Sequence, residues 1–155
     1  MSVNPMKTTN KRHSAKRVRT PLTRSEIMAR VRSRDTGPEL MVRRALHKMG
    51  YRYRLRWSNL PCRPDVLFPG RRAAIFVHGC FWHAHDCERG IRVPKANNDY
   101  WAKKLAANHA RDLRQVESLA NQDWRCLVIW ECELRSHDWP DKLRRFLGPT
   151  NISAA

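Results

Sequence analysis

Residues 65–78 read Asp-Val-Leu-Phe-Pro-Gly-Arg-Arg-Ala-Ala-Ile-Phe-Val-His. Two largely apolar runs, at 65–68 and 73–78, flank a Pro-Gly turn, and this pattern predicts a β-hairpin. A later apolar run at 126–131, Cys-Leu-Val-Ile-Trp-Glu, is typical of a buried strand. Residues 51–56 alternate between apolar and arginine side chains, which predicts a further, half-exposed strand.

Helical patterns surround these strands. Thr36-Gly37-Pro38-Glu39 has the form of a capping box with proline in the first turn, so a helix should begin there and end at Gly50. Its apolar stripe is predicted at Leu40, Met41, Ala45, Leu46 and Met49. Further helices are predicted at 25–32, 98–121 and 140–147. The candidate buried positions of the long helix are Tyr100, Trp101, Leu105, Leu113, Val116 and Leu119.

The order of these elements predicts an α/β fold with a mixed central sheet flanked by helices. A chain of 155 residues has room for one hydrophobic core. We therefore expect a single domain over 21–150, preceded by a basic disordered arm at 1–20 and followed by a tail at 151–155. No apolar run approaches the roughly 20 residues of a membrane span, so a soluble, intracellular protein is expected.

Basic residues dominate the composition, with 31 Lys and Arg against 14 Asp and Glu and a formal net charge of +17. Residues 1–24 hold seven Lys and Arg and no acid, but the rest of the chain is also basic. Such an excess favours a polyphosphate partner, because each neutralised phosphate releases counterions. Nucleic acid is the predicted partner, and a ribosome-like basic protein or a solvated charge run is the alternative.

Cysteine and histidine are concentrated at 78–87, which reads His-Gly-Cys-Phe-Trp-His-Ala-His-Asp-Cys. Together with a cysteine from the end of the later strand, this segment offers three thiolates and one imidazole, a set that suits tetrahedral Zn²⁺ in a structural role. The expected ligands are Cys80, His85, Cys87 and Cys132. His83 is the alternative imidazole ligand, and ordinary buried cysteines with surface histidines are the alternative to a metal site. Cys62 and Cys126 are expected to be bystanders.

Asp65 stands at the start of an apolar strand, where aspartate is disfavoured. A bound Mg²⁺ ion would compensate for the cost of placing the Asp65 carboxylate there, since this ion binds one or two carboxylates together with phosphate oxygens and water. Main-chain carbonyls of the partner strand, and His78 at its end, could come near. Glu39 is either a further acid of this site or a capping-box residue, and simple strand capping is the alternative for Asp65.

His83 lies between the predicted zinc ligands, and an imidazole held there can take a proton from an attacking water. It needs an acid to orient it. Asn108 and Asp112 share one face of the long helix with Trp101, so both can be presented to the site. Capping of a loop is the alternative role for the two polar residues.

Three aromatic side chains stand close to this polar chemistry. Phe81 and Trp82 lie in an irregular segment that offers no helix or strand face to cover them, whereas the helical spacing of Trp101 favours packing. Aromatic rings beside basic residues can wedge between base steps of a duplex, and all three can equally belong to the core.

Together these motifs resemble the very-short-patch repair (Vsr) DNA mismatch endonucleases. The matching segments are Thr23-Arg24-Ser25, Ser33-Arg34-Asp35-Thr36, Arg63-Pro64-Asp65, Phe76 to His83 with His85 and Cys87, Val93-Pro94, and Trp130-Glu131-Cys132. The resemblance implies a restriction-endonuclease-like fold and a nick in one strand on the 5′ side of the thymine in a T:G mismatch. It also implies a bacterial, cytoplasmic, nucleoid-associated enzyme that works beside a cytosine-5 methyltransferase.

The resemblance further implies roles for individual residues. Asp65 and the main-chain carbonyl of Val77 would hold Mg²⁺, and His83, supported by Asp112, would activate the water. The residues around the scissile phosphate would be Glu39, His78 and Asn108. The structural Zn²⁺ would be held by Cys80, His85, Cys87 and Cys132. The intercalating side chains would be Phe81, Trp82 and Trp101, with Met28 entering from the other side of the mismatch.

Restriction-type nucleases usually carry an acid, a spacer and a lysine on the second strand, whereas this chain has Phe76-Val77-His78 there. Asp65 would then carry most of the Mg²⁺ binding. We predict a monomeric, Mg²⁺-dependent, Zn²⁺-stabilised nickase of T:G-mismatched double-stranded DNA, with mismatch-repair proteins as candidate partners. The alternatives are a non-catalytic zinc-stabilised duplex-binding protein and a broader restriction-like nuclease.

Overall fold

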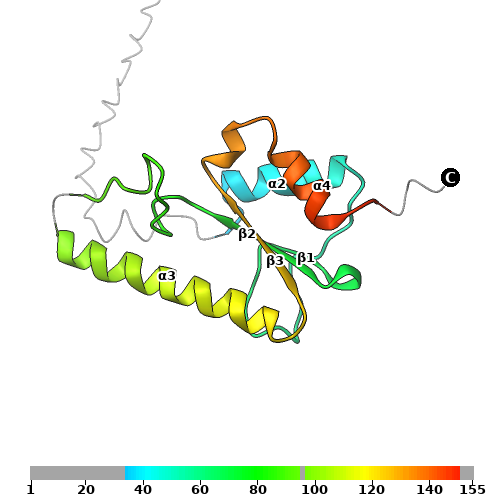
Figure 1. The fold of residues 1–155 in the computed structure, drawn as a ribbon, viewed down its shortest axis with the longest axis horizontal. Helices are drawn as coiled ribbons and strands as arrows, with labels where there is room; N and C mark the ends of the chain where they lie inside the picture. The colour runs from blue at the N-terminus through cyan, green and yellow to red at the C-terminus, as the bar shows by residue number, and fades with distance from the viewer. Residues whose placement is uncertain (1–33, 95–96, 151–155) are drawn as a thin grey trace, which may run out of the picture. The chain divides into compact units, whose positions relative to one another are not determined.

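The computed structural model of the protein describes residues 34–94 and 97–150. Its elements follow one another as helix, two strands, long helix, strand and short helix (Figure 1). Their bounds are α2 Gly37–Lys48, β1 Val66–Phe68, β2 Ala73–His78, α3 Asn98–Ala120, β3 Arg125–Trp130 and α4 Trp139–Leu147. Short 3₁₀ turns occupy Pro69–Arg71 and Glu133–Arg135. The predicted helix at 25–32, with Met28, lies outside the described residues.

The sheet is mixed, with the strand order β1-β2-β3. β1 and β2 pair antiparallel, with Val66 opposite Ile75, so the predicted hairpin is confirmed. The turn between them is closed by Arg72, whose backbone is left-handed at φ 45°. β2 and β3 run parallel, and their register places His78 opposite Trp130. The ends of β2 and β3 are therefore neighbours at the same end of the sheet.

The strand predicted at 51–56 is not formed. Arg54 and Leu67 exchange backbone hydrogen bonds of 2.8 Å on the outer edge of β1, and this is an isolated bridge. β1 is only three residues long, so it offers little backbone for a longer ladder. The apolar members of the alternation also lack a shared buried face, because Tyr51 is buried whereas Leu55 is 46% exposed.

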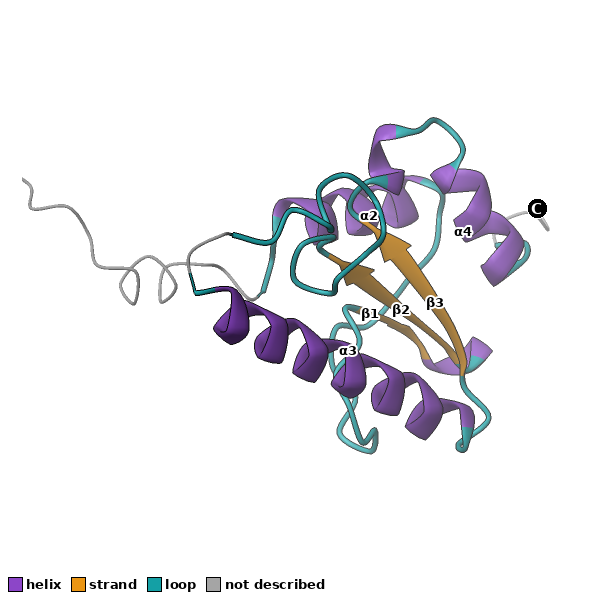
Figure 2. Ribbon diagram, turned by 60° about the vertical axis from the view of Figure 1, so that its left-hand side comes forward, coloured by secondary structure: helices purple, strands orange, loops and turns teal. Residues whose placement is uncertain are grey.

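Each face of the sheet has its own core, and the residues of β2 alternate between them. Ala73, Ile75 and Val77 pack with α2 and α4. Ala74 and Phe76 pack toward α3 through Leu119 and its neighbours. The helices accordingly lie on opposite sides of the sheet, with α2 and α4 on one side and α3 on the other (Figure 2). The predicted mixed α/β class is confirmed.

The helix boundaries match the sequence patterns better than the predicted buried faces do. Thr36 caps α2 as expected, but the buried residues of α2 are Glu39, Val42 and Leu46, whereas Met41 of the predicted stripe is 47% exposed. Packing on α4 explains the shift. α2 contributes Val42 and Leu46 to the one core that it shares with α4, so it buries a narrower stripe than its apolar residues alone suggest.

On α3, three of the six predicted buried positions are buried, namely Trp101, Leu105 and Leu119. Val116 is half-buried against the second core, while Tyr100 is 53% and Leu113 is 59% exposed. Asp112 takes a place on the buried face that periodicity would give to an apolar residue. None of the described helices is long and apolar enough to cross a membrane.

Candidate active site and metal centre

The start of β1 and the end of β2 meet at one end of the sheet, because the two strands are antiparallel. Asp65 immediately precedes β1. Its Oδ2 accepts a hydrogen bond of 2.7 Å from the Val77 N–H, and its own N–H donates to the Ile75 carbonyl at 3.1 Å. The hairpin thus fixes Asp65 beside Val77, the residue that precedes His78.

Burial raises the pKa of Asp65 from 3.8 to about 6. The hydrogen bond from Val77 and the Arg43 guanidinium oppose this increase, and the Glu39 carboxylate adds to it. Of the two carboxylate oxygens of Asp65, only Oδ2 has a hydrogen-bond partner among the described residues. Oδ1 can therefore accept a cation. A half-buried carboxylate whose desolvation is incompletely compensated, and which has one oxygen without a hydrogen bond, fits a hard ion such as Mg²⁺.

Glu39 completes a capping box at the start of α2. Its N–H donates to Thr36 Oγ1 at 3.4 Å, and its carboxylate accepts the Thr36 hydroxyl and the Asp35 N–H, both at 2.9 Å. It also lies close enough to Asp65 to raise the pKa of that carboxyl group. Glu39 is therefore both a capping-box residue and an acid close to Asp65, the two roles that the sequence left open. Its contact with the phosphate stays a prediction.

Arg43 joins the two carboxyl-bearing segments. Its Nη2 donates to Glu39 Oε2 at 3.0 Å and to the Asp65 carbonyl at 3.3 Å, and its Nη1 pairs with Asp35 Oδ1 at 2.5 Å. The guanidinium side chain is 11% exposed. Sequence reasoning missed this residue, although its position one helical turn after Glu39 is the usual spacing of an ion pair on a helix.

His83 is held by Asp112, whose Oδ2 pairs with His83 Nδ1. The acid therefore lies where the sequence-based interpretation placed it. The rings of His78 and His83 stack with their centroids 3.9 Å apart and their planes at 5°. Burial lowers the pKa of His78 to about 4, and the neighbouring His83 acts in the same direction. His78 is thus a neutral imidazole at physiological pH.

Asn108 has a different immediate partner from the one predicted. Its Nδ2 donates to the Trp82 carbonyl at 2.9 Å, so this side chain fastens the loop after β2 to α3. The bond lies one helical turn before Asp112, which binds the same loop through His83. Two successive turns of α3 therefore hold the loop that carries the candidate base.

A separate group contains the soft ligands. The ligand atoms of Cys80, His85, Cys87 and Cys132 all lie within 4.8 Å of one another. The Cys132 N–H donates to Cys80 Sγ at 3.3 Å, and Cys132 Sγ lies 3.7 Å from His85 Nδ1. His83 falls in the other group, with His78 and Asp112. Three sulfur atoms and one imidazole nitrogen at this spacing fit tetrahedral Zn²⁺.

The electrostatics of the sulfur atoms support the same fit. Burial raises the pKa of Cys80 to about 12 and raises that of Cys132, whereas the hydrogen bond with His85 lowers the pKa of Cys87 to about 6. Thiols must lose their protons to bind a metal ion, and the ion's charge then compensates the buried thiolates. Asp86 Oδ1 lies 3.3 Å from His85 Nε2, where a carboxylate can orient a ligating imidazole.

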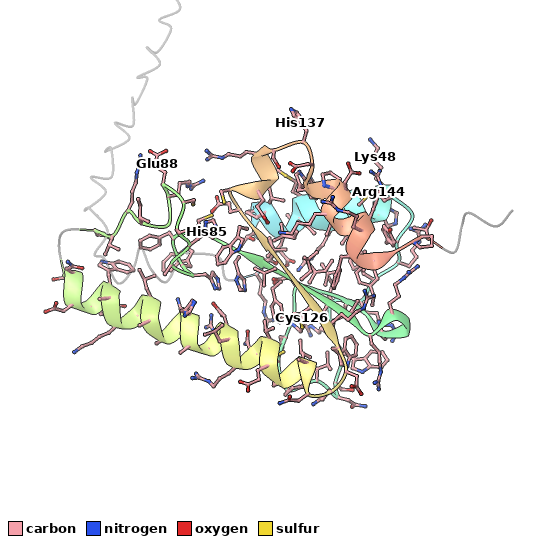
Figure 3. All side chains as sticks on the ribbon, viewed as in Figure 1. Lys48, His85, Glu88, Cys126, His137 and Arg144 are labelled. Atoms are coloured by element: carbon pink, nitrogen blue, oxygen red, sulfur yellow. The ribbon has the colours of Figure 1, made fainter. Side chains whose placement is uncertain are left out.

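The loop that carries these ligands is tightly closed, and His85 lies on it between β2 and α3 (Figure 3). A Cβ atom on Gly90 would lie 1.9 Å from the His85 carbonyl oxygen and 3.0 Å from that of Cys80. Only glycine fits at this position. Cys62 and Cys126 lie elsewhere, in the core between the sheet and α3, in keeping with their expected bystander role.

Phe81, Trp82 and Trp101 form an aromatic cluster. Their ring centroids are 5.1 Å apart for Phe81 and Trp82 and 5.3 Å for Phe81 and Trp101. Phe81 and Trp82 are half-buried, whereas Trp101 is 2% exposed. Lys104, which sequence reasoning also missed, places its ammonium 5.7 Å from the Trp82 ring centroid. The sequence did indicate a contact with this cluster, because Lys104 lies one helical turn after Trp101.

Comparison with known proteins gives consistent matches. A family model described as DNA mismatch endonuclease Vsr matches residues 16–89. The type II nicking enzyme V.XorIIP of Xanthomonas oryzae pv. oryzae is 47% identical over 131 residues, 84% of this chain and 96% of the relative. The DNA mismatch endonuclease Vsr of Escherichia coli is 38% identical over 116 residues, which cover 75% of this chain and 74% of the relative. The type II nicking enzyme V.NmeAIP of Neisseria meningitidis is 36% identical over 113 residues, 73% of this chain and 80% of the relative.

Proposed function

This chain belongs to the Vsr DNA mismatch endonuclease family and is an endonuclease, and on this basis we propose that it nicks T:G-mismatched duplex DNA. The proposed cut lies in one strand, on the 5′ side of the mismatched thymine, and depends on Mg²⁺. Deamination of 5-methylcytosine produces such mismatches, so the proposed role is their repair.

The observation that carries the mechanism is a continuous chain of contacts. Asp65 accepts the N–H of Val77, and the next residue, His78, stacks on His83. His83 in turn pairs with Asp112. An acid suited to Mg²⁺ and an imidazole suited to proton transfer therefore lie at the same end of one short sheet.

Asp65 and the carbonyl oxygen of Val77 would hold the Mg²⁺ ion. When bound, this ion neutralises charge on the scissile phosphate and makes it a better electrophile. The Asp65 backbone is already held on both sides, by Ile75 and by Arg43, so the carboxylate needs no reorganisation before it binds.

His83 is proposed as the general base. Because its Nδ1 is committed to Asp112, Nε2 is the nitrogen that can take a proton from the attacking water. The Asp112 carboxylate fixes the ring and the tautomer and stabilises the imidazolium that forms. His78, which is neutral, can donate a hydrogen bond to a phosphate oxygen without adding charge. Glu39 and Asn108 are proposed as the other residues around the scissile phosphate.

Zn²⁺ is proposed as a structural ion. Cys80 and His85 bracket His83 in the sequence, so ligation at both residues would hold the segment that carries the base. Cys132, just beyond β3, would tie this segment to the sheet. The four ligands would cross-link this irregular segment to itself and to the end of β3.

For DNA, Phe81 and Trp82 are the half-buried rings that are proposed to enter the duplex beside the mismatch. Trp101, which is buried, supports them from α3 and is proposed to become a contact only when the DNA opens. Met28 is proposed to act from the opposite side. A monomeric state, mismatch-repair partners and a cytoplasmic, nucleoid-associated location complete the proposal.

Strand-specific mapping tests the proposed reaction. End-labelled duplexes that differ only in T:G or C:G at one pair are incubated with the zinc-loaded protein, with and without Mg²⁺. We expect one nick 5′ of the thymine, only in the T:G duplex and only with Mg²⁺. Cutting of both strands in the C:G duplex would instead indicate a restriction-like nuclease, and Asp65→Ala should remove nicking while zinc content is retained.

A further inference from the structure

Trp130 is the last residue of β3 and lies between the two groups of the site. Its ring centroid is 4.3 Å from that of His85, a member of the Cys/His group. It is also 5.2 Å from the ring centroid of His78 and 6.4 Å from that of His83, with the planes at 74° in both cases.

The backbone of Trp130 is fixed independently of these rings. Its N–H donates to Glu133 Oε2 at 2.9 Å, and the other oxygen of Glu133 pairs with Lys142 of α4 at 2.7 Å. The following residue, Glu131, donates its N–H to the His78 carbonyl at 2.9 Å. The indole therefore projects from a rigid strand end toward His85 of the loop and His78 of the neighbouring strand.

The stacked imidazoles need such a contact. His83 is held by one hydrogen bond at Nδ1, which fixes that atom but leaves the ring free to tilt about the bond. His78 is flanked by Phe76 at 5.9 Å on its own strand and by His83 on its open face. A T-shaped indole against both rings removes the remaining tilt, and small displacements of a catalytic group cost large factors in rate.

We propose that Trp130 is a positioning residue, and that its indole is the contact through which the Cys/His group holds the stacked His78–His83 pair in its productive orientation. The inference rests on the proposed nicking function, because it assigns His83 the role of base. Trp130 touches neither substrate nor metal in this account; it acts through the imidazoles.

Three variants separate positioning from stability. Trp130→Leu fills the space without a ring, Trp130→Phe restores an aromatic face, and Trp124→Leu removes a half-buried tryptophan in the core next to α3. Single-turnover nicking of the T:G duplex should fall 10- to 100-fold in Trp130→Leu, with KM within about threefold of wild type. Trp130→Phe should recover most of the rate, and Trp124→Leu should keep the wild-type rate at temperatures where it is folded.

A second readout does not depend on activity. Ring ¹H–¹⁵N correlation spectra report the positions of His78 and His83 directly. In the zinc-loaded proteins, their signals should be displaced from the wild-type positions in Trp130→Leu and should lie close to the wild-type positions in Trp130→Phe. Zinc stoichiometry, measured by mass spectrometry, should stay the same in all three loaded proteins.

The two hypotheses fail in different ways. If wild-type protein does not nick T:G duplexes, the proposed function is wrong whatever the spectra show. If wild-type protein nicks and Trp130→Leu retains the full rate, or loses rate only in step with its zinc, Trp130 is not a positioning residue. The same conclusion follows if Trp124→Leu loses as much rate as Trp130→Leu.

Discussion

Replacing Asp65 with asparagine should abolish nicking and yet make the Mg²⁺-free protein more stable. Burial raises the pKa of this carboxyl group to about 6, from 3.8. The folded protein therefore binds a proton between these pH values that the unfolded chain has already released. The stability contributed by the protonated carboxyl is present below about pH 4 and is lost as the pH rises through 6.

The size of the effect follows from the shift. About two pKa units correspond to roughly 3 kcal/mol at pH 8, where both states have lost the proton. Asparagine has the same shape, stays neutral, and can still accept the Val77 N–H through its amide oxygen. We expect Asp65→Asn to raise the free energy of unfolding by about 2 kcal/mol at pH 8 and by about half as much at pH 5.

Urea unfolding of zinc-loaded protein in Mg²⁺-free buffer, followed by tryptophan fluorescence between pH 5 and 8, measures this difference. Mg²⁺ should stabilise the wild type and leave Asp65→Asn unchanged, because a ligand stabilises only the state that binds it. Asp141→Asn is the control, since Asp141 is 62% exposed and pairs with Arg144 at the surface. An Asp65→Asn variant that is no more stable than wild type at pH 8 would refute the reasoning.

Three further substitutions probe the rest of the site. Asp112→Asn should lower kcat about 100-fold with KM nearly unchanged, because it removes a charge-assisted hydrogen bond that is worth roughly 2–3 kcal/mol to the His83 imidazolium. An unchanged kcat in single-turnover nicking would exclude the role of Asp112. Arg43→Met should destabilise the protein by about 3 kcal/mol in thermal or urea unfolding, because it leaves Glu39 buried without its cation, and a neutral effect would contradict the assigned ion pair. Gly90→Ala should weaken zinc retention at least tenfold in chelator competition, because its Cβ would lie 1.9 Å from the His85 carbonyl oxygen; wild-type retention would show that the loop closes differently.

The hairpin, the long helix and β3 were predictable because periodicity and turn chemistry are local properties. The buried face of α2 was not, since Glu39 is buried by an ion pair with Arg43 and by its capping bonds, and neither interaction follows from hydrophobic spacing. The strand at 51–56 fails for a related reason. Residues 51–56 do alternate between apolar and arginine side chains. However, the length of β1 decides how many of them can pair with that strand, and β1 has only three residues.

The site was predictable where residue type and spacing carry the chemistry. Three potential soft ligands within eight residues, Cys80, His85 and Cys87, indicate a metal site in the sequence. The structure groups them with Cys132. Trp130 carries no such signal. Its position against three imidazoles depends on the parallel register of β2 and β3, which no pattern in either strand specifies.

The short sheet gives a physical reason for placing the proposed metal-binding loop beside the proposed catalytic groups. Three strands can fix Asp65 and His78 through backbone bonds, but His83 lies beyond the last residue of β2, where no neighbouring strand continues. Two turns of α3, through Asn108 and Asp112, hold this loop from one side. The Cys/His group holds it from the other, through a cysteine that follows β3 by two residues. Removing either support should free His83 while Asp65 stays in place, so cation binding at Asp65 should survive the loss of zinc although catalysis does not.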